Sequence, residues 1–221
     1  MINPINSLVD YMFIPFLTYT YSVIPNYGIG IIVLTILIKI LFYPLTQKQF
    51  KSMKMNQVLQ PEVKKLQEKH KDDPKLLQQE MMNLWKSNGV NPLSGCLPML
   101  IQLPFFFAIY ATINSGTFKQ LLTLPHINPG FLPFWLTNLG HPDPFYILPI
   151  GIGVLTWWSQ KMFITDPKQA SLFMFMPVVM TFICFNMPSG VLLYWFVSQL
   201  ISSAQQFLMM REPQVEGVQV V

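Results

Sequence analysis

Five apolar runs with one lysine-rich segment between the first two constrain this chain more than any other feature. Charged residues make up 11% of the sequence, against roughly 25% in an average soluble domain. Several runs are shorter than the ~20 residues that cross an ordinary bilayer core, which indicates a locally thinned bilayer. The sequence therefore predicts an all-α polytopic membrane protein of one domain. The expected transmembrane helices are 27–45, 93–113, 146–162, 170–185 and 191–210.

Basic residues predict the orientation of these spans. Nine lysines fall between residues 46 and 92, and Lys119 lies alone on the opposite side if the spans alternate. The positive-inside rule makes the lysine-rich side cytoplasmic. The N-terminus is then outside and the C-terminus inside. The expected cytoplasmic segments are 46–92, the link 163–169 and the tail 211–221. The expected extracytoplasmic segments are 1–26, the loop 114–145 and the turn 186–190.

Targeting signals are not apparent in the sequence. No basic residue precedes Lys39, so neither a cleavable signal sequence nor an Arg-rich import peptide is expected. A bacterial plasma membrane is the predicted location. The two cysteines, Cys96 and Cys184, are predicted near opposite faces of the bilayer, too far apart for a disulfide.

Residues 1–26 carry one charge, Asp10, and their apolar residues recur at helical spacing. This pattern predicts an amphipathic helix along the membrane surface, with a disordered lead-in as the alternative. The apolar positions are Leu8, Val9, Met12, Phe13, Phe16 and Leu17.

The segment 46–92 is predicted to form two antiparallel helices outside the membrane. Pro61 and the Asp73-Pro74 pair are interpreted as helix starts, with Asp73 as N-cap and Pro74 in the first helical position. Asn88-Gly89 is typical of a helix stop. The apolar stripe of the second helix is Leu77, Met81, Leu84 and Trp85.

The run LTILIKILFYPL contains a charge, Lys39, about 10 Å from the predicted cytoplasmic end of its helix at 1.5 Å per residue. A mid-span charge costs roughly 2.5–3.5 kcal/mol on insertion scales and usually faces protein or water. No acidic residue occurs in any span. The Lys39 charge must therefore be hydrated, neutralised or offered to an external group, and hydration requires a cavity that reaches in from the cytoplasm. Snorkelling without function is the alternative.

Other polar or amphipathic residues in the spans are candidates for lining such a cavity. For each of them, a helix–helix hydrogen bond or an interfacial anchor is the alternative. The candidates are Thr35, Gln102, Gln160, Tyr194 and Trp195, with Ser198 and Gln199 beside them.

The stretch FYPLTQKQFKSMKMNQVLQPEVKKLQEKHKDDPKLLQQEMMNLWKSNGVNPLSGCLPMLIQLPFFFAIY resembles the YidC family of membrane protein insertases, related to the Oxa and Alb proteins. DPFYILPI, QKM, FMPVVMTF and PSGVLLYW continue the resemblance in the same order, from about residue 27 to 210. The resemblance implies five helices around a hydrophilic groove open to the cytoplasm. Its family hallmark is a cation in the first core span, usually arginine, which matches Lys39. Thr35, Gln160 and Trp195 match other groove positions.

The mechanism implied by this resemblance combines attraction in the groove with an apolar path into lipid. Lys39 would attract acidic residues in a substrate's polar tail, while the substrate's apolar segment slides along the second and fourth spans. The expected slide residues are Pro104, Phe105, Met176, Pro177 and Phe182. The cytoplasmic hairpin is the expected docking element, with candidate residues Asp72, Asp73, Pro74, Glu80 and Met81.

Nascent membrane proteins are the expected partners within the lipid bilayer. The Sec translocon, the ribosome and targeting factors are further candidates, although the tail REPQVEGVQVV lacks the basic extension that touches ribosomes in many relatives. No DNA, cofactor or metal is expected.

Three alternatives to an insertase remain. A small anion channel or transporter would use Lys39 as its charged site, but the five unequal spans show no inverted repeat. A pure assembly chaperone would share the fold. An enzyme is disfavoured because Ser115 and Ser189 lack the flanks of a nucleophile elbow. The histidines, which have no ligand-like spacing, are His70, His126 and His141.

Overall fold

The computed structural model describes residues 7–91, 97–124, 128–163 and 167–211, and every regular element in these ranges is a helix. The prediction of an all-α fold is therefore confirmed for this part of the chain. The elements are η1 (Val9–Phe13), α2 (Ile14–Val23), α3 (Tyr27–Leu41), α4 (Tyr43–Lys69), α5 (Pro74–Ser87), α6 (Leu97–Asn114), α7 (Gly116–Leu122), α8 (Ile147–Phe163), α9 (Pro167–Cys184) and α10 (Ser189–Arg211).

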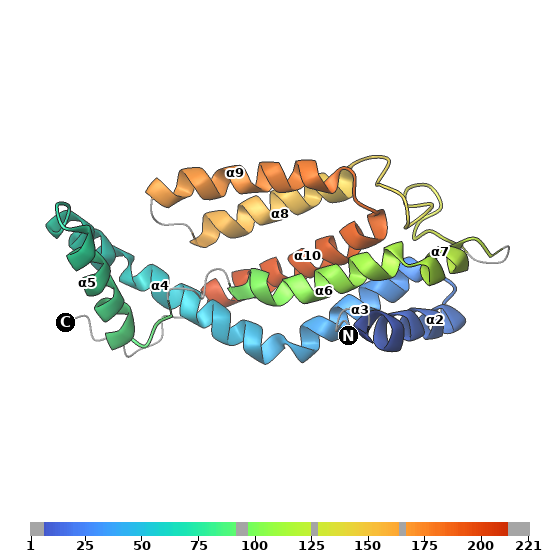
Figure 1. The fold of residues 1–221 in the computed structure, drawn as a ribbon, viewed down its shortest axis with the longest axis horizontal. Helices are drawn as coiled ribbons and strands as arrows, with labels where there is room; N and C mark the ends of the chain where they lie inside the picture. The colour runs from blue at the N-terminus through green and yellow to red at the C-terminus, as the bar shows by residue number, and fades with distance from the viewer. Residues whose placement is uncertain (1–6, 92–96, 125–127, 164–166, 212–221) are drawn as a thin grey trace.

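Helix α10 is the centre of the helical body, because α3, α6 and α8 all pack against it (Figure 1). Its first turns carry the fully buried residues Val191 and Leu192. Helix α9 packs on α8, and α2 packs on α3. The hairpin of α4 and α5 extends beyond one end of this body (Figure 1). At that end, α10 packs against α4.

Helices α3, α6, α8, α9 and α10 correspond in sequence to the five apolar runs. Within the described ranges, no helix taken singly has both the length and the apolarity expected of a membrane span. Helices α3 and α4 meet that test only when joined across their bend. The prediction of five transmembrane helices thus stays a prediction. The tail after Arg211, residues 164–166 of the link 163–169 and Cys96 lie outside the described residues.

The first described residues are helical, as the amphipathic pattern predicts. Val9, Phe13 and Leu17 are buried on one side of η1 and α2, while Asp10 is exposed. The η1 turn packs against α6 and α2 packs against α3. The apolar stripe therefore contacts the protein's own core, and the alternative of a disordered lead-in is wrong for residues 7–23.

The first apolar run does not form one straight helix to Leu45. It breaks at Phe42, and the axes of α3 and α4 differ by 65°. Pro44 lies in the first turn of α4. In a continuous helix its ring would clash with the carbonyl of Ile40, and it has no N–H for the Ile40 oxygen. The bend lies three residues after Lys39, which places the charge in the last turn of α3.

The hairpin confirms one predicted helix start and contradicts the other. Asp73 Oδ1 accepts hydrogen bonds from Lys75 N at 3.1 Å and Leu76 N at 3.0 Å, and α5 begins at Pro74. Helix α5 ends before Gly89, which has a φ of +63°.

Pro61, in contrast, does not start a helix but lies within α4. A proline inside a helix removes one backbone hydrogen bond at a cost of about 3 kcal/mol. The neighbouring residues Leu59 and Val63 are buried, and α4 packs against α5. This burial offsets the cost and keeps α4 continuous.

A buried carboxylate organises the loop before α8. Asp143 is 1% exposed, and its two oxygens accept from Trp135 Nε1 at 2.7 Å, Phe145 N at 3.1 Å and Leu148 N at 2.7 Å. The charge is thus satisfied by three N–H donors, as a buried carboxylate requires.

The same loop is also tied to the start of α10. Ser189 N donates to His141 O at 2.7 Å and Gly190 N donates to Leu139 O at 2.9 Å. The loop therefore links the first residues of α8 and α10 at the end of the body that lies opposite the hairpin (Figure 1).

Candidate functional site between α3, α4 and α10

Lys39 lies between α3 and α10. Its Nζ donates to Ser202 Oγ at 2.7 Å, and in the described part of the chain it forms no ion pair. The side chain is half-buried and lines a recess of about 220 Å³. The other residues lining this recess are Ile36, Ile40, Tyr43, Pro44, Ile201 and Gln205. A neutral hydroxyl is therefore the protein group that solvates this ammonium.

A larger recess of about 440 Å³ adjoins the first, because Tyr43 and Gln205 line both. Its further lining residues are Thr46, Gln47, Phe50, Leu208, Met209 and Arg211. These residues belong to the start of α4 and the end of α10. Lys39 lines the smaller recess, and the larger one lies nearer the hairpin.

Gln102 and Tyr194, both predicted groove residues, contact each other across α6 and α10. Gln102 Nε2 donates to Tyr194 Oη at 2.8 Å. Tyr194 is 1% exposed, so its hydroxyl is occupied by this contact between the two helices. Trp195, half-buried on the next position of α10, packs edge-on against Phe106 of α6 with ring centroids 5.2 Å apart. The structure brings these three predicted residues to the α6–α10 interface.

Thr35 and Gln160 lie away from the Lys39 recess. Thr35 is fully buried, and its hydroxyl donates to Ile31 O of its own helix at 2.6 Å. Gln160 is on α8, and its Oε1 is a buried acceptor with no donor among the described residues. The predicted groove residues thus fall into several groups around α10 rather than lining a single recess with Lys39.

A polar cluster between α8 and α10 was missed by the sequence analysis, apart from Gln199. Ser159 Oγ of α8 lies 2.9 Å from Ser203 Oγ of α10. Gln206 Nε2 donates to Ser159 O at 3.0 Å, and Gln199 Nε2 donates to Ser159 Oγ at 3.5 Å. Ser202 and Ser203 therefore bridge α10 to two different helices, α3 through Lys39 and α8 through Ser159.

A sequence signal for these contacts exists in α10. Tyr194, Ser198 and Ser202 recur every four residues, and Gln199, Ser203 and Gln206 follow at helical spacing. Residues three or four apart share a helix face. The two polar rows of the last apolar run therefore mark two faces that contact different neighbours.

The predicted slide residues differ in exposure. Phe182 is 64% exposed on α9, Met176 is half-buried and Pro177 is buried. On α6, Pro104 is exposed and Phe105 packs against Phe42 at 5.2 Å between ring centroids. Helix α9 packs on α8 whereas α6 packs on α10.

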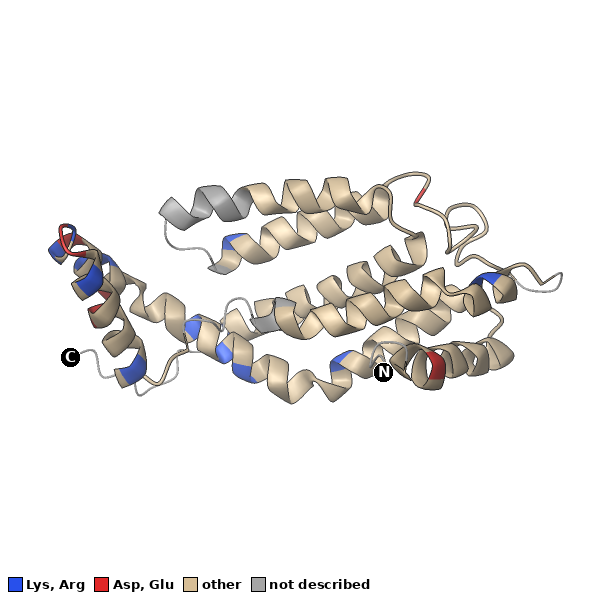
Figure 2. Ribbon diagram, viewed as in Figure 1, with Lys and Arg blue, Asp and Glu red and all other residues tan. Residues whose placement is uncertain are grey.

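The predicted docking residues lie on the distal part of the hairpin. Asp73 and Pro74 have the structural role of starting α5, and Asp72 beside them is exposed. Glu80 and Met81 are half-buried on α5. Lysines concentrate on α4 and α5, while the helical body carries few charges (Figure 2). Among the described residues, no cluster of three or more His, Cys, Asp or Glu side chains could hold a metal ion.

Comparisons with known proteins point to one family. The family model described as the 60Kd inner membrane protein matches residues 19–216. The chain is 47% identical over 192 residues to the protein of Maridesulfovibrio salexigens named membrane protein insertase YidC, covering 84% of this chain and 35% of that one. It is 42% identical over 200 residues to the protein of the same name from Francisella tularensis subsp. novicida, covering 90% and 35%.

A solved structure is also similar. It is described as an active YidC insertase crystal structure with the first transmembrane domain resolved, and it matches with a TM-score of 0.72 and 27% identity. The match covers 91% of this chain and 46% of the solved chain. The chain thus spans about a third of the length of the curated relatives that it matches, at 35% of each.

Proposed function

This chain belongs to the 60Kd inner membrane protein family, and on that basis we propose that it is a membrane protein insertase and folding chaperone of the bacterial inner membrane. Its substrates are newly made membrane proteins. The N-terminus is outside, the hairpin and the C-terminus are cytoplasmic, and α3, α6, α8, α9 and α10 cross the bilayer. The concentration of lysines on the hairpin supports this orientation (Figure 2).

The observation that carries the proposal is a half-buried cation without an acidic partner. The one hydrogen bond of Lys39 among the described residues is to a hydroxyl, and Lys39 lines a recess of about 220 Å³ that shares Tyr43 and Gln205 with a second recess of about 440 Å³ nearer the hairpin. In this setting the positive charge attracts an acidic residue in a substrate's tail more strongly than it would in bulk water. The recess shortens the apolar barrier that a polar tail has to cross.

The exposed apolar surfaces of α6 and α9 are the proposed path of the substrate's apolar segment into lipid. Phe182 on α9 and Phe107 on α6 are 64% and 49% exposed. Because the substrates are unrelated helices, a surface of Phe and flexible Met side chains suits them. The hairpin receives the arriving chain or its targeting factor, with Asp72 and Glu80 as candidate contacts.

Reconstitution into Sec-free liposomes tests the proposal. The substrate is a small single-span protein with an acidic tail, and a neutral-tail version is the matched control. Lys39→Arg is expected to retain insertion, because it keeps the charge. Lys39→Glu is expected to fail. Lys39→Ala should lower insertion of the acidic tail about tenfold, or about 1.4 kcal/mol, while the neutral tail changes little.

Equal insertion by wild type and the three variants would reject the attraction mechanism. The same liposomes address the second candidate, an anion channel or transporter that uses Lys39. That function predicts anion conductance without a substrate protein, abolished by Lys39→Ala. Insertion without conductance excludes it.

A further inference from the structure

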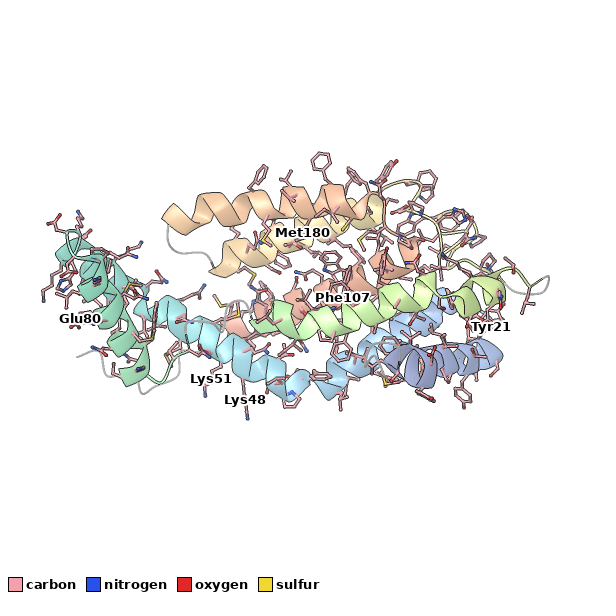
Figure 3. All side chains as sticks on the ribbon, in the orientation of Figure 1. Tyr21, Lys48, Lys51, Glu80, Phe107 and Met180 are labelled. Carbon is pink, nitrogen blue, oxygen red and sulfur yellow. The ribbon has the colours of Figure 1, made fainter. Side chains whose placement is uncertain are left out.

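We propose that Lys48 and Lys51, on the first turns of α4, form a contact surface for anionic phospholipid headgroups of the inner leaflet. This inference rests on the membrane arrangement proposed above, but not on how a substrate is inserted. Both lysines are exposed and point away from the helical body (Figure 3).

The depth of these two lysines follows from the contacts of the next residues of α4. Lys54 Nζ donates to Met209 O at 3.1 Å, two residues before α10 ends. Gln57 Nε2 donates to Met162 O, one residue before α8 ends. Residues 54–57 of α4 are therefore level with the inner ends of two spans.

Lys51 and Lys48 precede Lys54 by three and six residues, or about 4.5 and 9 Å along the helix. The headgroup layer on each side of a bilayer is about 5–7 Å thick. Because α4 is bent by 65° from α3, these distances are upper limits on the depth of the two lysines below Lys54. Lys51 thus lies within that layer, and the flexible stem of Lys48 allows its ammonium to reach it.

The type of residue that is exposed along α3 and α4 changes near the inner ends of the spans. Leu41 is 73% exposed at the end of α3, which requires hydrocarbon around it if α3 spans the membrane. Tyr43, 45% exposed, follows at the bend. The first exposed cation beyond it is Lys48. The order apolar, aromatic, basic is that of a membrane–water interface.

The opposite side of this segment is occupied by the protein. Gln49 and Phe50 are buried, and Lys54 is engaged with α10. Lys48 and Lys51 are the lysines of these turns that are exposed, and the negative phosphates of the inner leaflet are the complementary surface at that depth.

Residue-resolved lysine labelling tests this inference. The full chain is reconstituted into vesicles of phosphatidylcholine alone or with added phosphatidylglycerol, and a membrane-impermeant amine reagent is applied to the hairpin side. Mass spectrometry then gives the rate at each lysine. Phosphatidylglycerol should slow labelling of Lys48 and Lys51 by about fivefold each, the factor expected for one lysine at an anionic surface. High salt should remove the difference.

Lys64 and Lys65 are the matched controls in the same chain. Both are exposed lysines of α4, but they lie about 15 Å further along the helix from Lys54, on the side away from the spans. Their labelling rates should not change. The same rate for Lys48 and Lys51 in both kinds of vesicle overturns the inference.

Two further arms identify the source of any protection. Soluble glycerol phosphate added to phosphatidylcholine vesicles should not protect Lys48 or Lys51, and equal protection by it would indicate a site for free anions instead. Protection that arises only when ribosomes are added would assign these lysines to that partner and overturn the lipid contact.

Thermal unfolding of variants provides an independent measurement. Added phosphatidylglycerol should raise the unfolding midpoint of wild type and of Lys64→Gln/Lys65→Gln, and the shift should be largely lost in Lys48→Gln/Lys51→Gln. Extraction of the chain from vesicles by alkaline carbonate would contradict the membrane arrangement itself. A carbonate-resistant chain with unprotected lysines would overturn only the lipid contact.

Discussion

The Nζ of Lys39 on α3 donates a 2.7 Å hydrogen bond to the Oγ of Ser202 on α10. A serine holds an ammonium group without neutralising it. An ammonium has three donors, and this bond uses one of them. The bond fixes the position of the cation while leaving its charge and its other donors available to a ligand from the recess.

Substitutions of Ser202 distinguish the position of the Lys39 ammonium from its charge as the property that insertion requires. Ser202→Ala should reduce insertion of an acidic-tail substrate a few-fold, because Lys39 loses its tether but keeps its charge. Ser202→Asp should abolish that insertion, since the new carboxylate pairs with Lys39. The ratio of acidic-tail to neutral-tail insertion in liposomes is the measurement. Ser203→Ala, which alters the contact with Ser159 instead, is the control and should leave that ratio unchanged.

Asp143 is expected to be the most sensitive carboxylate of the chain for stability. Asp143→Ala leaves Trp135 Nε1 and Leu148 N without their acceptor. Each buried donor without a partner costs about 1–3 kcal/mol. The unfolding midpoint in detergent should fall clearly. The exposed Asp10→Asn is the control and should leave it unchanged. A midpoint for Asp143→Ala equal to that of wild type would contradict the proposed role of the loop.

The close contact between α8 and α9 depends on the lack of a Cβ at Gly153. A Cβ there would clash with Thr181 Oγ1, whereas one at Gly116 would meet nothing within 4 Å. Gly153→Ala should therefore destabilise the protein by about 1–3 kcal/mol, as overpacking does. Gly116→Ala should not. Because the clash involves one hydroxyl, Thr181→Ala should rescue Gly153→Ala in a thermal melt. Failure of this rescue would mean that the backbones of α8 and α9 cannot tolerate the methyl group.

The hairpin can be shortened without disturbing the helical body. Lys54 and Gln57 contact the ends of α10 and α8, so a deletion has to begin after them. Replacing residues 60–88 by a short Gly/Ser linker removes α5 and the last ten of the 27 residues of α4. Insertion should be lost while the chain stays resistant to carbonate extraction. Normal insertion by this variant would remove the distal hairpin from the mechanism.

Local capping signals were read correctly from the sequence, because they depend on a few neighbouring residues. Asp73, Pro74 and Gly89 start and stop α5 as predicted. Pro61 was misread because tertiary burial of its neighbours overrides its helix-breaking tendency. The break at Phe42 was missed because apolar composition alone does not distinguish a straight span from a bent one.

The candidate site was predicted only in part. Lys39 stands out because a charge in an apolar run is rare. Its partner Ser202 is an ordinary residue of another helix, 163 positions away, and no local pattern identifies such a pair. Asp143 also lacks a local signal, since its partner Trp135 reaches it through a folded loop.

The unequal packing of α9 and α10 has a mechanical consequence. In the described part of the chain, α10 is bonded through side chains to α3, α6 and α8 at once, while α9 packs substantially on α8 alone. A displacement of α10 would break several polar contacts together, whereas a displacement of α9 would disturb its packing on α8 alone. The fold thus combines a central helix held by three neighbours with a peripheral helix held by one, so that α9 can be displaced at the cost of a single interface.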